Sequence, residues 1–231
     1  MKRLQNFAMC ALLLLPAAAF AGEVIDGVVA AVSRQPVLQS DWDDATRFEA
    51  FMQQKPLAAV NERDRVAALQ RLIDRRLLES QMNDRNAFAP SREEVRSTIS
   101  KVRAQIPAAK DEAGWLGVLA SYNLTEREVE EHLRVETQMM NFIEVRLRPN
   151  VHVQPEEVEA YYRAQLLPDL ERAGVKVVTL EEVSPRIREL LVQQHMDELL
   201  DAWLHNLRQQ TPVQSTIPLP GPTEREGMGG I

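Results

Sequence analysis

The sequence predicts a mostly α-helical fold: a single helical domain closed by its C-terminal helix, with a small two- or three-stranded β element joining the N- and C-termini. Two observations predict it. Apolar residues recur at three- and four-residue spacing along several long segments, as in amphipathic helices. Short runs typical of strands lie near both ends, at residues 24–32, 37–38 and 213–217. Because so few strands are only marginally stable alone, we expect them to pair and to pack on the helices.

The first 21 residues have the three-part layout of a secretory signal peptide. Lys2 and Arg3 precede an apolar run at 7–15, and small residues then lead to an A-x-A cleavage site that ends at Ala21. A membrane-spanning helix needs about 20 apolar residues, and this run is shorter. We therefore expect cleavage after Ala21 and export of the chain. Cys10 would be removed with the signal, which excludes disulfides and thiol chemistry from the mature protein.

The mature chain is acidic. The signal holds 2 of the 27 basic residues and none of the 34 acidic ones, so the net charge becomes 25 minus 34, or −9. An acidic protein does not favour a polyanionic partner, so neither nucleic acid nor an anionic membrane surface is expected. The predicted organisation is one domain at 22–217 and a flexible tail at 218–231, which is rich in Pro and Gly.

Capping residues and apolar stripes predict the helices of the first two thirds of the chain. Ser40 is the expected N-cap of the first helix, and an apolar stripe predicts a long helix at 61–83. Capping boxes predict two more helices, at 91–105 (Ser91 with Glu94) and at 125–147 (Thr125 with Glu128). A shorter helix is expected between them, at 112–122.

Prolines organise the last third of the chain. Pro155 suits the first position of a helix, and Pro168 is expected to end or kink that helix near Leu167. Ser184 and Pro185 are expected to open the last long helix. Its predicted apolar stripe consists of Ile187, Leu190, Leu191, Leu199, Leu200, Trp203, Leu204 and Leu207.

Several of these segments resemble the core domain of the SurA family of periplasmic chaperones, which is related to the PrsA-type foldases. The segments lie at 28–32, 37–41, 72–78, 124–136, 153–162, 180–188 and 203–208. The resemblance implies a periplasmic location and a role in binding unfolded proteins. Family members usually enter a parvulin-type prolyl isomerase domain after the segment that matches 153–162. Only residues 163–179 follow here before the closing helix, whereas an independent domain needs upward of about 50 residues. The sequence therefore predicts no isomerase domain and no enzymatic activity.

One helix face could in principle gather a metal ion. Glu128, His132 and Glu136 lie four residues apart on the predicted helix at 125–147. The first and last of them are separated by about 12 Å along the helix axis, too far to close around one ion. A solvated, charged helix face is the better interpretation, and neither a metal nor another cofactor is expected.

A chaperone groove needs soft apolar surface, and methionine is well suited to it because its thioether is flexible and polarizable. The candidate peptide-binding residues are Met82, Trp115, Tyr122, Met139, Met140, Phe142 and Met196. The alternative is that they form ordinary core, since apolar stripes on helices are usually buried.

The expected function is ATP-independent binding of unfolded outer-membrane or exported proteins, which prevents their aggregation. The resemblance supplies this client class. Two alternatives stay open: an envelope adaptor that binds one folded partner, and a prolyl isomerase with an unrecognised site.

Overall fold

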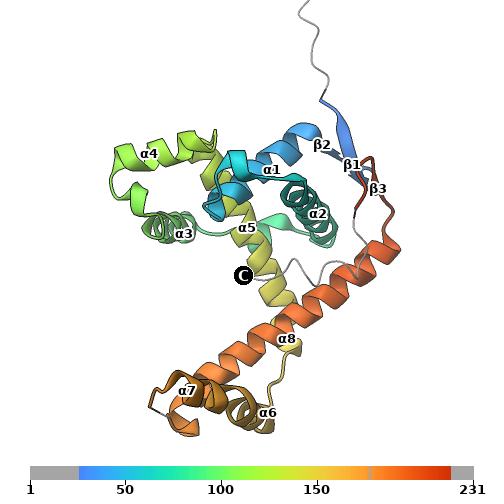
Figure 1. Ribbon diagram of the computed structural model, residues 1–231. Helices are drawn as coiled ribbons and strands as arrows, with labels where there is room; N and C mark the ends of the chain where they lie inside the picture. The colour runs from blue at the N-terminus through green and yellow to red at the C-terminus, as the bar shows by residue number, and fades with distance from the viewer. Residues whose placement is uncertain (1–25, 177, 220–231) are drawn as a thin grey trace, which may run out of the picture.

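The computed structural model describes residues 26–176 and 178–219, and this part of the chain is mostly helical (Figure 1). The predicted signal peptide and residues 220–231 of the predicted tail lie outside it. The α-helices are α1 (Gln39–Met52), α2 (Glu62–Glu79), α3 (Arg92–Ala104), α4 (Glu112–Ser121), α5 (Glu126–Leu147), α6 (Pro155–Tyr161), α7 (Leu167–Ala173) and α8 (Leu180–Gln210). Short 3₁₀ turns are η1 (Leu57–Ala59), η2 (Arg85–Phe88), η3 (Pro107–Ala109) and η4 (Arg148–Asn150), and η5 (Tyr162–Leu166) is a π-helical segment. No helix in the described residues is both long and apolar enough to span a bilayer.

A three-stranded antiparallel sheet joins the two ends of the described chain, which confirms the predicted fold class. β1 (Val28–Val32) lies between β2 (Gln35–Leu38) and β3 (Val213–Ser215). Val32 pairs with Gln35 on one side and with Val213 on the other. The tight turn between β1 and β2 holds Ser33 at a φ of 56°, and its N–H donates to the Pro212 carbonyl at 2.8 Å. The returning chain therefore helps to hold this hairpin.

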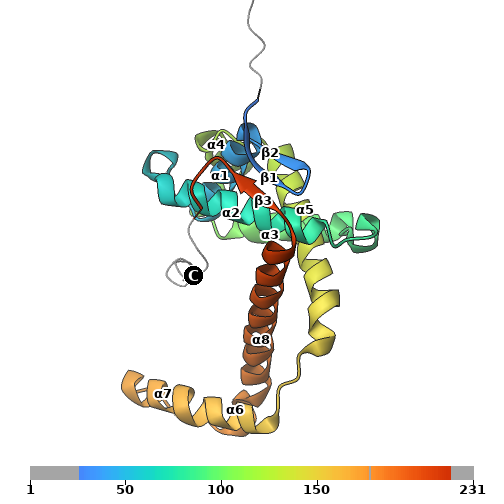
Figure 2. The same ribbon diagram turned by 90° about the vertical axis from the view of Figure 1, so that its right-hand side faces the viewer.

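The main body has two hydrophobic cores that share α1 and α5. The first lies between the sheet and helices α1, α2, α5 and α8; Leu69 and Leu77 are fully buried there. The second lies between α1, η3, α4 and α5, around Phe51 and Trp115. Figures 1 and 2 show α5 running from the second core, past α2, toward the lower part of the molecule.

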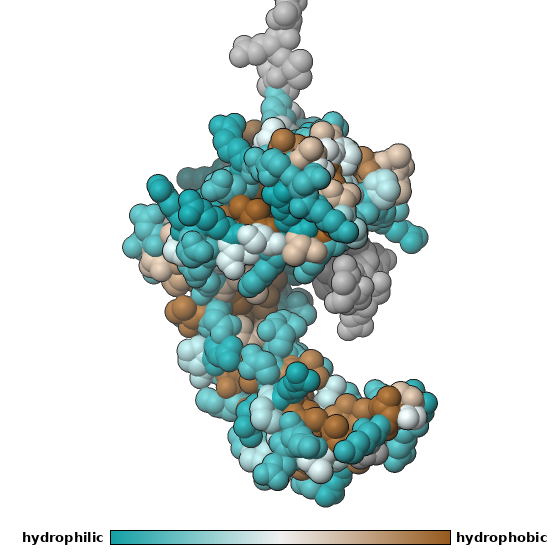
Figure 3. Space-filling view, turned by 90° about the vertical axis from the view of Figure 1, so that its left-hand side faces the viewer, coloured by the Kyte–Doolittle hydropathy of each residue, from teal (hydrophilic) through white to brown (hydrophobic). Residues whose placement is uncertain are grey.

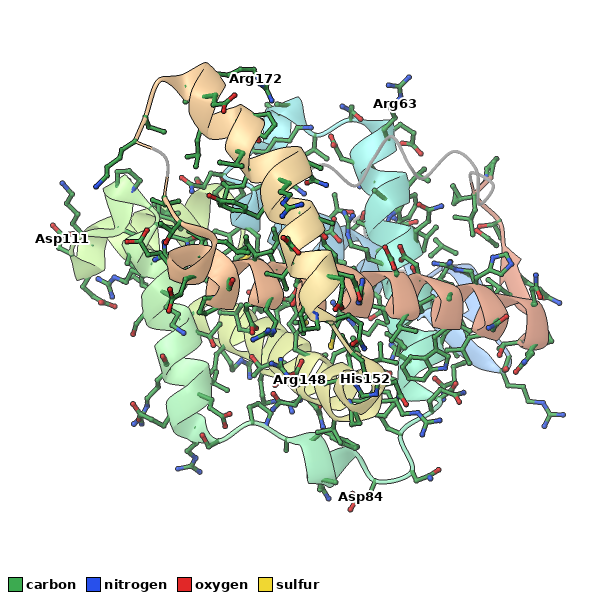
Figure 4. All side chains as sticks on the ribbon, turned by 90° about the horizontal axis from the view of Figure 1, so that it is seen from below. Arg63, Asp84, Asp111, Arg148, His152 and Arg172 are labelled. Carbon is green, nitrogen blue, oxygen red and sulfur yellow. The ribbon has the colours of Figure 1, made fainter. Side chains whose placement is uncertain are left out.

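A distal lobe projects from the main body and is built from α6, η5, α7 and the first half of α8 (Figure 2). Its small core consists of Val158, Ile187 and Leu191, with half-buried apolar residues around them. Figure 4 shows the α6–α7 helix crossing α8, with Arg148 and His152 marking the connection from α5 and Arg172 near the far end of α7. Apolar surface is visible on this lobe in Figure 3, because so small a core leaves many of its apolar side chains partly exposed.

Pro168, which was predicted to end or kink its helix near Leu167, does not end it, but the helix changes to a π-helical turn directly before Leu167. The chain passes from α6 through the π-helical η5 into α7, with Pro168 at the second position of α7. A proline ring clashes with the carbonyl four residues earlier in a regular α-helix. The wider π-helical turn precedes that position and accommodates the ring, so the helix continues to Gly174, which ends it at a φ of 64°.

Three predicted helix boundaries were wrong. α1 begins at Gln39 with Leu38 as its N-cap, and the Ser40 hydroxyl donates instead to Asp26. α2 ends at Glu79, not at residue 83. α8 begins at Leu180, because Thr179 and Glu182 form a capping box that precedes Ser184. In these cases the hydrogen bonds of the first or last turn, rather than the residue type alone, decide the boundary.

The predicted stripe on α8 is also split between two cores. Ile187 and Leu191 belong to the distal lobe, whereas Leu204 and Leu207 belong to the first core. Leu190 and Leu199 are exposed. At the start of the predicted tail, Leu219 packs against the first core.

Candidate functional site

Four of the seven candidate peptide-binding residues are core residues. Trp115 and Tyr122 are buried in the second core, where both rings meet Phe51 edge-on at centroid distances of 5.9 and 5.7 Å. Phe142 and Met196 are buried in the first core. These side chains fill space between packed helices, as the alternative interpretation expected, although Phe142 also lines a cavity beside η2.

The other three candidates are accessible. Met82 and Met139 are half-buried at the edge of the first core and line the same cavity. Met82 lies in the turn after α2, and its N–H donates to the Glu79 carbonyl at 3.2 Å. Met140 is 60% exposed on α5 and lines neither of the two cavities between α2 and α5.

The two cavities between α2 and α5 adjoin, and we call them together the α2–α5 groove. The inner cavity, of about 510 Å³, is lined by Asp41, Asp44, Leu72, Arg75, Arg76, Glu79, Arg127, Glu128, Glu131, His132 and Val135. The outer cavity, of about 380 Å³, is lined by Arg76, Glu79, Met82, Asn86, Glu131, Arg134, Val135, Gln138 and Met139. Because four residues line both cavities, the groove is continuous from α1 to η2.

Helix packing sets the two walls of the groove. Leu72 faces the first core from α2, and Val135 lies opposite it on α5, one turn after His132. The Thr125 capping box fixes the start of α5, with the Glu128 N–H donating to the Thr125 hydroxyl at 3.3 Å. These contacts give the groove an apolar floor between two charged walls.

The carboxylates along the groove already have partners. Asp44 accepts one hydrogen bond from Arg47 at 2.9 Å and pairs with His132 Nε2 at 2.8 Å. Glu79 pairs with Arg76 at 3.0 Å.

The remaining three carboxylates are also engaged. Glu131 pairs with Arg134 at 2.7 Å. Glu128 accepts from the Thr125 N–H at 2.7 Å, and these capping bonds lower the pKa of its carboxyl. Asp41 accepts from the Leu38 N–H at 3.2 Å. The acidic lining is thus used in ion pairs and helix caps.

The three residues of the rejected metal site serve different purposes. Glu128 caps α5, and the His132 ring stacks on Phe48 at a centroid distance of 4.2 Å while it pairs with Asp44. Burial raises the pKa of the Glu136 carboxyl, an effect that the nearby positive charge of Arg75 opposes. No group of three potential ligands that could hold a metal ion occurs in the described residues.

A second hollow lies on the other side of η2. This cavity of about 630 Å³ is lined in part by Phe88, Phe142, Val145 and Trp203. Phe142 contacts the rings of both Phe88 and Trp203, at 5.1 and 5.7 Å between centroids. Sequence reasoning missed Phe88, because it lies in a short 3₁₀ turn outside every apolar stripe.

The lining of the α2–α5 groove suits noncovalent binding. Flexible methionines at one end and paired charges along both walls can contact many different polypeptide segments, since neither demands one ligand shape. Two of the candidate residues that the sequence suggested, Met82 and Met139, line this groove. Arg75 and Arg127 were not singled out, because nothing in the sequence distinguishes them from the other 25 basic residues.

Comparison with known protein families gives one match. A family model described as the SurA-like N-terminal domain matches residues 1–142, more than half of the chain. The match includes every residue that lines the α2–α5 groove. No curated protein matches the chain.

Proposed function

Since the chain belongs to the family of SurA-like N-terminal domains, whose role is chaperone-like, we propose that it binds unfolded exported polypeptides and keeps them from aggregating without ATP. The clients we propose are precursors of outer-membrane proteins, and the site of action is the periplasm after cleavage behind Ala21. The observation that carries the proposal is the continuous α2–α5 groove with Met82 and Met139 at its outer end.

The dimensions of the groove support binding of a short stretch of extended chain. Its cavities, of about 510 and 380 Å³, fall within the range of pockets that hold small molecules. Each can therefore accept one or a few client side chains. Leu72 and Val135 offer apolar contact in the inner cavity, and the methionines offer it in the outer cavity. Such contacts hold many sequences weakly, which is what a chaperone for diverse clients requires.

The proposal is tested by light scattering. An outer-membrane β-barrel protein is diluted from urea with and without an equimolar amount of the predicted mature chain, Gly22 to Ile231, in the absence of nucleotide. We expect the chain to suppress the scattering. Absence of suppression with several β-barrel clients would contradict the proposal and favour an adaptor for one folded partner.

Variants then locate the binding site. The double substitution Met82→Gln and Met139→Gln keeps the size of both side chains but makes them polar, and it is expected to weaken the suppression. Met52→Gln is the matched control, because Met52 is an exposed methionine at the end of α1 that lines neither cavity. An equal effect of the control and the double variant would rule out the groove as the binding site. Met140→Gln tests the remaining candidate in the same assay.

A further inference from the structure

Two arginines in the inner cavity have no ion-pair partner within 4 Å among the described residues. Arg75 belongs to α2 and Arg127 to α5, so they approach the cavity from its two walls. Glu136 lies near enough to Arg75 for the guanidinium to influence its pKa, but the two form no ion pair. The cavity's own carboxylates are held by other partners, as described above.

This arrangement is informative because the protein is acidic. Its 34 carboxylate residues outnumber its 27 basic ones, so an arginine has many potential partners. Guanidinium groups bind carboxylates with two parallel hydrogen bonds, which are about twice as strong as hydrogen bonds between neutral groups. Two such groups beside the apolar floor of Leu72 and Val135 would recognise a carboxylate that lies next to an apolar group.

We propose that the inner cavity binds the C-terminal carboxylate of a client polypeptide. Arg75 and Arg127 donate to the carboxylate, while the side chain of the last client residue packs on Leu72 and Val135. A C-terminal residue carries its carboxylate and an apolar side chain on the same Cα atom, so it can use both features at once. An internal Asp or Glu carries the carboxylate in place of an apolar side chain and leaves the floor uncovered. This inference rests on the proposed function and adds selectivity for chain ends to it.

The test compares two fluorescently labelled peptides by anisotropy. Both have the same ten-residue neutral, apolar sequence ending in Leu; one has a free C-terminal carboxylate and the other a C-terminal amide. We expect the mature chain to bind the free-acid peptide about tenfold more tightly at low salt, and 0.5 M salt to reduce this preference. A third peptide, amidated at its end but with one internal Glu, carries the same charge in the other position and is expected to bind like the amide.

Variants assign the preference to the two arginines. The double substitution Arg75→Gln and Arg127→Gln is expected to abolish the difference between acid and amide. Arg63→Gln is the matched control; Arg63 lies at the exposed start of α2, outside the groove, and the change should leave the preference intact (Figure 4). Circular dichroism melting curves check that each variant is folded.

The outcomes separate this inference from the proposed function. Equal binding of acid and amide by the unmodified chain would overturn the inference and leave the chaperone proposal standing. A preference for the free-acid peptide that persists in the folded Arg75→Gln, Arg127→Gln variant would also overturn the inference. Binding of the internal-Glu peptide as tight as that of the free-acid peptide would do the same. Failure to bind any of the peptides, together with no suppression of light scattering, would overturn both.

Discussion

Replacing Gly114 by alanine is expected to destabilise the protein, whereas the same change at Gly117, in the same helix, is expected to stabilise it. Both glycines lie inside α4, where alanine is normally favoured over glycine by about 1 kcal/mol. A Cβ atom at Gly117 would meet nothing within 4 Å. One at Gly114 would lie 2.2 Å from the carbonyl oxygen of Ala108.

The magnitude follows from that contact. The Ala108 carbonyl or the start of α4 would have to move by about 1 Å to reach a normal separation from the new methyl group, and overpacking of this kind costs about 1–3 kcal/mol. The movement would also disturb the cap of the helix, because the Gly114 N–H donates to the Asp111 carboxylate at 2.7 Å; loss of an N-cap costs about 1 kcal/mol. After the gain in helix propensity, Gly114→Ala should lower the free energy of unfolding by roughly 1–3 kcal/mol. Gly117→Ala should raise it by about 0.5–1 kcal/mol.

Urea unfolding of the two variants and the parent chain, followed by circular dichroism, measures both changes. The comparison is well controlled, because each variant adds one methyl group to the same helix at a different position. If Gly114→Ala stabilised the chain as much as Gly117→Ala does, the close packing of η3 on α4 would be refuted as the reason for Gly114.

Three further predictions concern single side chains. Burial raises the pKa of the Glu136 carboxyl above its usual 4.5, so its contribution to stability is complete below that value and is lost as the pH rises through the higher folded-state pKa. Glu136→Gln should therefore raise the free energy of unfolding at pH 7 but not at pH 4 in urea titrations; an equal effect at both values would contradict this. Thr179→Ala should lower the free energy of opening of the distal lobe, measured by hydrogen exchange, by about 1 kcal/mol, because it removes the N-cap of α8. Ser184→Ala should change this free energy little. The reverse order would place the start of α8 at Ser184. Tyr162→Phe removes the hydrogen bond to the Val178 carbonyl and should lower the same free energy of opening by about 0.5–1.5 kcal/mol. Unchanged hydrogen exchange would refute a role for that bond.

The helices and the joined ends could be predicted because their signals are local and strong. The capping boxes at Ser91 and Thr125 form as expected, and Pro155 occupies the first turn of α6. The start of α8 was missed because Ser184 and Pro185 look like a second, competing start. Pro185 instead lies inside the first turns of the helix. At this sixth position of the helix the proline removes one backbone hydrogen bond, because an N–H there would donate to the Glu181 carbonyl four residues earlier.

The candidate site could be predicted only in part, because composition marks soft apolar residues but not which of them remain accessible. Met82 and Met139 line the same cavity although 57 positions separate them in the sequence. Met196 carries the same chemistry, yet the crossing of α8 over the first core buries it. Whether Arg75 and Arg127 have an ion-pair partner among the described residues depends on which carboxylates the neighbouring helices already engage. This can be read only from the three-dimensional structure.

The last third of the chain supports a groove that it does not line. All residues around the groove lie between positions 41 and 139, yet α8 packs Leu204 and Leu207 into the core beneath α2 and α5. Arg208 Nε also donates to Asp74 on α2 at 2.9 Å, and β3 then pairs with β1. Because α2 forms one wall of the groove and contacts α8 directly, α8 helps to hold that wall in place. The first half of α8 carries the core of the distal lobe, so one continuous helix joins that lobe to the helix that packs behind the groove.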